Sequence, residues 1–509
     1  MSASSPARAG RSARTPSAAS LSPAPPGRRS STRSAVLVWF RSDLRLADHP
    51  ALAAARETQA DLVPVFIWSP GEEGRWAPGA TGRYWLHQSL RALAEDLEAL
   101  GSRLILRSGD AVEQLGRLLE ETHASAIYWN RRYEPAARAQ EQRVRARLSG
   151  AAALHEFPGN LLFEPHELKT KAGGPFRVFT PFYREALRQL EVSPGSLTTQ
   201  GRPRRLRAPL HWPPSLGLEE LRLPPAIDWA GGIRSAWTFG EGAAMRRLRG
   251  FLSGPAASYD RLHDRVGEEG TSRLSAHLHF GELSPQQIWR ALQSAPPNTG
   301  VESFRRQILW REFAHHVLAY FPELPERPLD RRFGRMPWSR GRAGLEAWKR
   351  GRTGYPLVDA AMRQLWRTGW MHNRARMVAA SFLIKDLLVD WREGQAWFWD
   401  TLVDGDLANN AFNWQWVAGC GADPAPFFRV FNPVLQAKKF DPHGQYVRRF
   451  LPELARLPDG FLHEPAGAPR SELSRAGIVL GKTYPRPIVD HAEARDRALL
   501  AFTRRSTAI

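Results

Sequence analysis

The sequence predicts an α/β protein with an N-terminal doubly wound parallel-sheet (Rossmann-like) domain, a long linker and an all-helical C-terminal domain. Five short runs of apolar, β-branched or aromatic residues alternate with helical patterns in the first third of the chain. This alternation is typical of parallel βαβ units. Beyond residue 237 the apolar residues recur at the i, i+3, i+4 and i+7 spacing of amphipathic helices, and strand patterns are hard to find.

Length and composition limit the classes of protein to consider. A chain of 509 residues is too long for one core. No run approaches the roughly 20 apolar residues that cross a bilayer, so we expect a soluble protein without a membrane partner. The single cysteine, Cys420, excludes internal disulfides and thiolate metal sites. The formal net charge of +20 favours nucleic acid as a partner, although an Arg-rich composition alone would also produce it.

Residues 1–34 consist mainly of Ser, Ala, Pro and Arg and contain no acidic residue. This composition predicts a disordered basic tail. An organelle transit peptide has a similar composition, so organelle targeting stays open beside the plain tail. The segment has no apolar core of a secretion signal, which argues against export.

Strands are expected in the N-terminal α/β domain, residues 35–165. The runs that predict them are AVLVWF (35–40), DLVPVFIW (61–68), RLILRSG (103–109), SAIYWN (125–130) and ALHEF (153–157). Ligands of parallel sheets lie beyond the carboxyl ends of the strands, so the segment RSDLRLADHPAL (41–52) is a candidate site. It has no G-x-G-x-x-G, and an ordinary dinucleotide-binding half is not supported.

A linker rich in Pro, Arg and Gly is expected over residues 166–236, and a helical domain over residues 237–500. The clearest helical patterns are EGAAMRRLRGFL (241–252), SPQQIWRALQ (284–293), VESFRRQILWREFAHHVLAYF (301–321), YPLVDAAMRQLWRTG (355–369) and RMVAASFLIKDLLVDW (376–391).

Tryptophan is concentrated in residues 355–416. This segment holds seven of the 19 tryptophans: Trp366, Trp370, Trp391, Trp397, Trp399, Trp414 and Trp416. Most buried tryptophans serve packing. Two further uses are stacking on nucleic-acid bases and passing electrons to a redox cofactor. The same segment contains Asp404 and Asp406, which need cationic partners if they are buried.

Three short motifs are chance matches. DGDLANN (404–410) lacks the calcium-loop spacing, GIVLGKT (477–483) lacks that of a phosphate loop, and His315-His316 lacks that of a zinc helix, so we expect no metal. The segment GTSRLS (270–275) is more informative. Thr271 or Ser272 could cap a helix, or with Arg273 could bind a phosphate group.

Several long blocks together resemble the photolyase/cryptochrome family of flavoproteins. The blocks are VLVWFRSDLRLADHPAL, GTSRLSAHLHFGELSP, LWREFAHH, GRTGYPLVDAAMRQLWRTGWMHNRARM, DWREG, DGDLANN with WQW, and FRVFNP with KKFDP. They run from about residue 35 to 497 in family order and look most like the microbial class I enzymes that repair cyclobutane pyrimidine dimers. The resemblance implies a light-driven DNA-repair lyase whose excited reduced FAD lends an electron to the dimer and recovers it after the split.

The resemblance implies that FAD lies in the helical domain. The implied cofactor residues are Tyr259, Thr271, Ser272, Arg273, Leu274, Ser275, Phe304, Arg311, Arg376, Asp404, Gly405, Asp406 and Asn410. Arg376 is implied to pair with Asp404 beside the isoalloxazine. Asn410 matches the asparagine that faces flavin N5 and favours the reduced cofactor.

The resemblance also implies residues for electron transfer and for the lesion. By resemblance, Trp414 is expected nearest the flavin, Trp391 next and Trp338 at the surface. The lesion would be flipped out of the duplex into a pocket beside the flavin. The implied DNA-binding residues are Gln307, Trp310, Asn373, Arg374, Met377, Trp416 and Gln436, with Trp310 and Trp416 stacking on the two thymines.

Two features bear on the choice of lesion. Members that repair cyclobutane dimers carry a glutamate where this chain has Gln307, whose amide can donate a hydrogen bond but cannot supply a proton. The (6-4) branch carries histidines where this chain has Asn373 and Met377, and these histidines act in proton transfer. The cyclobutane dimer is therefore favoured.

A second chromophore is undetermined. Folate-binding members have an Asn-Glu pair where this chain has Ala136 and Ala137, which argues against folate and leaves a deazaflavin or none. The alternative functions are a cryptochrome-like photoreceptor, repair of (6-4) photoproducts, and nonspecific binding of nucleic acid. Asn410, the lesion pocket and the short C-terminus favour repair of UV-damaged DNA over the photoreceptor. We also expect a monomer. We expect a bacterial cytoplasmic, nucleoid-associated protein.

Overall fold

A computed structural model describes residues 34–192, 199–427 and 429–507 of the chain. The tail predicted at residues 1–34 lies outside this part, apart from Ser34. The described residues form one compact unit by their contacts. No helix among them is long and apolar enough to cross a membrane.

The predicted doubly wound parallel sheet is confirmed. Its strands are β1 (Ala35–Phe40), β2 (Asp61–Trp68), β3 (Ile105–Ser108), β4 (Ala124–Asn130) and β5 (Ala153–Phe157). They pair in parallel in the order β3-β2-β1-β4-β5, so that the chain starts in the middle of the sheet and winds outward in both directions. The order reverses between β1 and β4, which is where doubly wound sheets open a crevice at the carboxyl ends of their strands.

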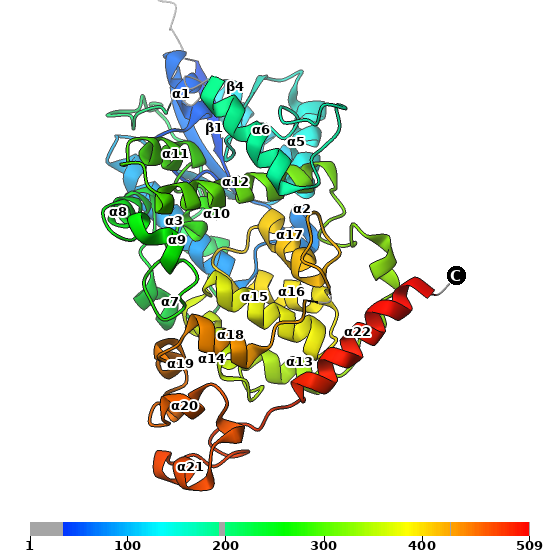
Figure 1. Cartoon of the computed structure of the whole chain (residues 1–509). Helices are drawn as coiled ribbons and strands as arrows, with labels where there is room; N and C mark the ends of the chain where they lie inside the picture. Colours follow the sequence, from blue (N-terminus) through cyan, green and yellow to red (C-terminus); the bar gives the residue numbers. More distant parts are fainter. Residues whose placement is uncertain (1–33, 193–198, 428, 508–509) are drawn as a thin grey trace, which may run out of the picture. The chain divides into compact units, whose positions relative to one another are not determined.

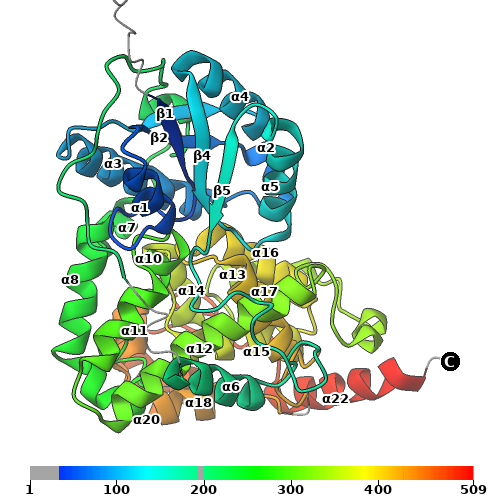
Figure 2. The same cartoon turned by 90° about the horizontal axis from the view of Figure 1, so that it is seen from above.

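Helices cover both faces of this sheet (Figure 2). They are α1 (Pro50–Glu57), α2 (Pro70–Glu73), α3 (Ala80–Glu98), α4 (Ala111–Thr122) and α5 (Pro135–Leu148). The alternation of side chains along β1 explains the two layers. Val36 and Val38 pack in one cluster with residues of α1 and α3, whereas Leu37 and Trp39 pack in another with residues of α4 and α5.

The predicted linker, residues 166–236, contains regular structure and packs on the sheet domain. It includes α6 (Phe179–Val192), a 3₁₀ turn η3 (Leu218–Leu221) and α7 (Gly231–Ala236). The Leu206 N–H donates to the Leu100 carbonyl at 3.1 Å, and the Leu216 N–H donates to the Leu106 carbonyl at 3.0 Å. The Pro and Arg content of this segment therefore indicated irregular backbone correctly, but the segment is not a linker free of contacts with the sheet domain. Residues 193–198 lie outside the described part.

The rest of the described chain is helical, as predicted (Figure 1). Its helices are α8 (Glu241–Leu252), α9 (Tyr259–Leu262), α10 (Ser275–His279), α11 (Pro285–Gln293), α12 (Thr299–Tyr320), α13 (Arg342–Lys349), α14 (Pro356–Thr368), α15 (Asn373–Ser381), α16 (Trp391–Thr401), α17 (Leu407–Ala418), α18 (Pro433–Phe440), α19 (Gln445–Phe450), α20 (Asp459–Leu462), α21 (Arg470–Ala476) and α22 (His491–Thr507).

One predicted helix is divided in two. The pattern at 376–391 suggested a continuous helix, but α15 ends at Ser381 and passes into a π-helical turn, Phe382–Asp386. Leu388 then takes a positive φ of 54°, and the Asp390 carboxylate accepts from the Arg392 N–H at 3.0 Å to begin α16. An N-cap aspartate supplies the acceptor that a new helix start needs, which the apolar periodicity could not show.

The candidate site at 41–52 serves mainly to dock the helical part on the sheet. The Leu44 N–H donates to the Phe280 carbonyl at 3.1 Å, and Arg45 Nη1 donates to the Gly281 carbonyl at 3.0 Å. Gly281 has a φ of +64°, and a Cβ there would collide with the backbone of Ser42 and Asp43. Only glycine, which has no Cβ, allows the two backbones to approach this closely. The prediction of a ligand site over this segment was wrong for most of its length.

Candidate functional site

A cavity of about 470 Å³ opens between α12, α15, α17 and the loop before α10. Its volume falls within the range of about 300–1,000 Å³ that is usual for ligand sites. The predicted site residues that line it are Tyr259, Thr271, Ser272, Arg273, Leu274, Ser275, Phe304, Gln307, Trp310, Arg311, Asn373, Arg376, Met377, Asp404, Asp406, Asn410, Trp414 and Trp416. Folding thus brings together motifs that are more than 100 residues apart in the chain.

Five predicted site residues lie elsewhere. Gly405 lines a second cavity, and Trp338, Trp391, Arg374 and Gln436 line neither cavity. Trp391 is fully buried at the start of α16, and Trp338 packs at the edge of the same hydrophobic cluster. Gln436 lies on α18.

An ion pair fixes one wall of the first cavity. Arg376 Nη2 donates to both carboxylate oxygens of Asp404, at 3.0 and 2.8 Å, which is the pairing that the resemblance implies. Arg376 Nε donates to the Met371 carbonyl at 2.7 Å. The Asp404 side chain is only 4% exposed. A buried carboxylate of this kind needs its cation, and the extra bond to Met371 holds the guanidinium in place.

Asp406 is held from two directions. Its carboxylate accepts from the Asn409 N–H at 2.8 Å and so caps α17. On the other side, Oδ2 lies 3.3 Å from His315 Nε2. Burial raises the pKa of Asp406, but the facing His315 and the nearby Arg311 outweigh it and hold that pKa well below its usual range. The carboxylate is therefore charged at neutral pH.

The segment from Thr271 to Ser275 lines the same cavity and offers further donors. Arg273 has a positive φ of 51°, and its guanidinium lies 4.9 Å from the Trp370 ring. Arg273 Nη2 donates to Glu269 at 3.0 Å, while the buried Nε has no hydrogen-bond partner among the described residues. Neither Thr271 nor Ser272 is the N-cap of α10, which is Leu274. The capping alternative is thus wrong, and the phosphate alternative remains open.

The donor set fits FAD. Hydroxyls and the unpartnered Arg273 Nε suit a pyrophosphate. Asp404, Asp406 and the amide of Asn410 can meet the polar edge of an isoalloxazine, and Phe304, Phe412 and Trp414 supply an apolar lining. Asn410 Nδ2 donates to the Gln395 carbonyl at 3.1 Å, which fixes the orientation of its amide.

Trp414 forms the inner wall and is fixed by aromatic neighbours. Its ring lies 4.9 Å from Phe398 and 6.3 Å from Trp348, both in T-shaped contact. A Cβ at Gly394 on α16 would collide with the Trp414 ring, so glycine allows α16 and α17 to approach closely here. Trp348 was missed by sequence analysis because it lies outside the recognised motifs.

Trp310 forms the outer wall with Gln307, one turn earlier on α12. Its ring stacks on Phe179 with centroids 3.6 Å apart and planes 8° apart. The Arg306 guanidinium lies 5.1 Å from the Phe179 ring on α6. Phe179 is 1% exposed and supports Trp310 from the protein side. Sequence analysis missed Phe179 because it falls within the predicted linker.

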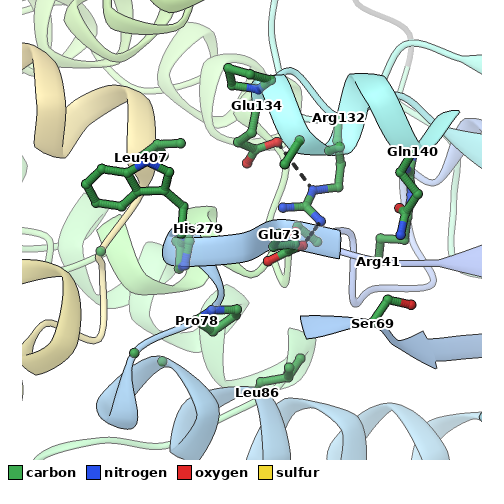
Figure 3. Close-up of a pocket in the computed structure, with 18 of the residues that line it drawn as sticks. Arg41, Ser69, Glu73, Pro78, Leu86, Arg132, Glu134, Gln140, His279 and Leu407 are labelled. Atoms are coloured by element: carbon green, nitrogen blue, oxygen red, sulfur yellow. Dashed lines mark hydrogen bonds and ion pairs between the residues drawn. The ribbon is translucent and has the colours of Figure 1, made fainter. Parts of the chain in front are cut away.

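A second cavity of about 270 Å³ lies between the sheet domain and α16 (Figure 3). Figure 3 shows Arg132 between Glu73 and Glu134, and Nη1 donates to Glu73 at 2.6 Å while Nε donates to Glu134 at 3.3 Å. Trp76 and Trp399 meet at 5.5 Å in T-shaped contact. Ala136 and Ala137, the positions that argued against folate, line this cavity.

Comparison with known proteins gives the family. A model described as "DNA photolyase" matches residues 36–203, and one described as "FAD binding domain of DNA photolyase" matches residues 304–504. The deoxyribodipyrimidine photo-lyase of Agrobacterium fabrum is 48% identical over 92% of this chain and 97% of its own length. Cryptochrome-1 of Arabidopsis thaliana is 38% identical over 91% of this chain and 69% of its own. The chain belongs to the photolyase/cryptochrome family.

A solved structure agrees with this assignment. A bacterial class III photolyase from Agrobacterium tumefaciens superposes with a TM-score of 0.91 at 46% identity, covering 95% of this chain and all of the other. Its fold matches the parallel sheet and helical domain described above.

Proposed function

We propose that this protein is a light-dependent DNA-repair lyase that uses FAD to split cyclobutane pyrimidine dimers. The observation that carries the proposal is the first cavity, which combines a flavin-binding set with the aromatic walls Trp310 and Trp416. A binding protein without chemistry would not need both.

FAD would be held by the Arg376–Asp404 pair, Asp406 and Asn410 at its ring end and by the Thr271–Ser275 segment at its phosphates. When bound and reduced, FAD supplies the light-excited electron for the split. Gly405 would shape the turn between the two acids. The chain Trp338, Trp391 and Trp414 would return the flavin to its reduced state, and the contact of all three with one hydrophobic cluster supports it.

The residues of the outer cavity would receive the flipped lesion. Trp310 and Trp416 would stack on the two bases, and the Gln307 amide would donate a hydrogen bond to a carbonyl. Asn373 Nδ2 lies 4.0 Å from Met377 Sδ, so these side chains form a continuous edge without an acid or base. The absence of histidine at these two positions favours the cyclobutane dimer over the (6-4) photoproduct.

The class within the family is also a proposal. The sequence blocks suggested class I, but the solved relative at 46% identity is named a class III photolyase. We therefore propose class III. The chain would act as a monomer on nucleoid DNA in the bacterial cytoplasm, with domains at 35–165 and 237–500 joined by residues 166–236.

The decisive experiment is repair under blue light. Protein with fully reduced FAD is incubated with DNA containing a single cyclobutane dimer or a single (6-4) photoproduct, and restored thymines are counted. We expect restoration of the cyclobutane dimer alone. No restoration in light would exclude the lyase and favour the cryptochrome-like photoreceptor, which its 38% identity to Cryptochrome-1 of Arabidopsis thaliana keeps as the second candidate.

The second cavity suggests a second chromophore. Trp39, Trp68, Trp76 and Trp399 line it, and such a lining suits a planar aromatic molecule. An absorption spectrum of the purified protein, with any band beyond those of the flavin, would identify its class and distinguish a folate from a deazaflavin.

A further inference from the structure

Arg374 lies on α15 next to Asn373, which lines the first cavity, and is held by an acid that sequence analysis did not single out. Its Nε donates to Asp264 Oδ1 at 3.1 Å, and its Nη2 donates to Asp264 Oδ2 at 2.5 Å. The guanidinium carbon lies 4.3 Å from the Phe440 ring centroid. A two-point ion pair and a cation–π contact together leave the guanidinium one orientation.

Asp264 itself is fixed relative to the helix that carries Gln436. The Val266 N–H donates to the Phe440 carbonyl at 3.2 Å. Arg265 Nη1 donates to the Lys439 carbonyl at 3.0 Å. The loop that follows α9 is therefore tied to the end of α18 by the two residues directly after Asp264, and the acid connects two predicted DNA-binding segments.

The pairing leaves one edge of the guanidinium available. Arginine has five N–H donors, and Asp264 engages one on Nε and one on Nη2. Among the described residues Arg374 Nη1 makes no hydrogen bond. The Arg374 side chain is 18% exposed, so this edge can reach a ligand at the surface.

We propose that Asp264 is a positioning residue, which presents the free edge of Arg374 to a phosphate of the damaged strand. This inference rests on the proposed function, because it requires lesion DNA to dock over the first cavity. An alternative role for Asp264 would be to mask the charge of Arg374. The two roles predict opposite effects of removing the carboxylate: loss of a positioned contact weakens binding, whereas removal of a negative charge from a DNA-binding surface strengthens it.

The test compares Asp264→Asn with a matched control. Asp260→Asn removes the same charge four residues earlier, where Asp260 accepts from Thr299 Oγ1 at 2.8 Å and has no part in the Arg374 contact. Affinity for a duplex with one cyclobutane dimer is measured at several salt concentrations, with flavin content as the check of folding.

For Asp264→Asn we expect affinity to fall about tenfold, as for one lost charge-assisted hydrogen bond. The slope of log affinity against log salt should become shallower by about one phosphate contact. Asp264→Glu should recover part of both losses. Asp260→Asn should keep the wild-type slope and bind as tightly or more tightly. A purely structural role for Asp264 would not change the salt slope.

A second variant keeps the test decisive if Asp264→Asn loses its flavin. Arg374→Lys keeps the charge but cannot make the two-point contact, and it should show the same loss of affinity and slope. Wild-type slopes in both Asp264→Asn and Arg374→Lys, in protein that repairs dimers, would overturn the positioning role and leave the proposed function intact. Failure of the wild-type protein to repair would instead overturn the proposed function.

Discussion

The two cavities share part of a wall but are built from different parts of the chain. His279 and Leu402 line both of them. The first cavity takes its polar groups from motifs of the helical domain, and each charged group in it has a fixed partner. The second combines the ends of strands β1 and β2 with α5 and α16, and it depends on one arginine between two glutamates. The difference teaches that one site is encoded in local motifs, whereas the other exists only where two domains meet.

The largest expected effect is the loss of FAD from Asp404→Ala. This change leaves the partly buried Arg376 without its carboxylate, and an uncompensated charge of this kind costs a few kcal/mol. We expect bound flavin per protein, measured by absorbance, to fall about tenfold or more. Arg132→Gln, which removes the cation between Glu73 and Glu134 in the second cavity, should leave the flavin content unchanged. Equal flavin loss in both variants would show that the cavities are not independent.

Phe179→Leu should reduce repair without loss of FAD. The change keeps an apolar side chain but removes the ring that stacks on Trp310, a contact worth about 0.5–1.5 kcal/mol. We expect a drop in repair efficiency of about threefold to tenfold, mainly through weaker binding of dimer DNA. Flavin absorbance should match that of the wild type. If repair is unchanged, Trp310 does not need its support from α6.

His279, which lines both cavities, should make the stability of the fold depend on pH. Burial lowers the pKa of His279 below its ordinary value of 6.5, despite the opposing charges of Asp406 and Glu134. The neutral form therefore stabilises the fold fully above about pH 6.5, and this contribution is lost as pH falls through the lowered pKa.

Urea denaturation at pH 7 and pH 5 measures this contribution. The free energy of unfolding of the wild-type protein should be lower at pH 5 than at pH 7. The binding of up to one proton by His279 should account for part of this difference. His279→Asn should lose less stability between the same two pH values. An identical pH dependence in the two proteins would assign the loss to other groups, such as His372, whose pKa burial lowers to about 3.

The smallest effect on repair is expected from Trp76→Leu in the second cavity. This variant removes one of the paired rings and should lose any absorption band beyond those of the flavin. Under saturating blue light, repair should stay within about twofold of wild type, because the first cavity is intact. A large loss of repair under these conditions would mean that the second cavity supports the chemistry itself.

The sequence was sufficient for the elements whose burial pattern is local. The strands at 35–40, 61–68 and 153–157 were predicted with the bounds that the structure has. The first two are buried and form largely apolar runs, as buried parallel strands do. The third is the partly exposed edge strand of the sheet. The helix at 376–391 was predicted too long, since apolar periodicity does not show where Asp390 restarts the helix.

The tertiary structure alone assigned the supporting residues of the site. His315 belonged to a pair without metal spacing, Phe179 lay in an apparent linker, and Asp264 lay in an unremarkable loop. Nothing in their neighbours along the chain shows that they face Asp406, Trp310 and Arg374. Such contacts join segments more than 90 residues apart.

By itself the sequence determined the fold class, because the strand and helix patterns repeat within short segments. The resemblance of its motifs to a known family implied 18 of the residues that line the first cavity. The tertiary structure decided which charges are paired, which aromatic ring supports another, and that a second cavity exists between the domains. These depend on the packing of distant segments, and packing distances of a few ångströms are not encoded in the order of residues along any one of them.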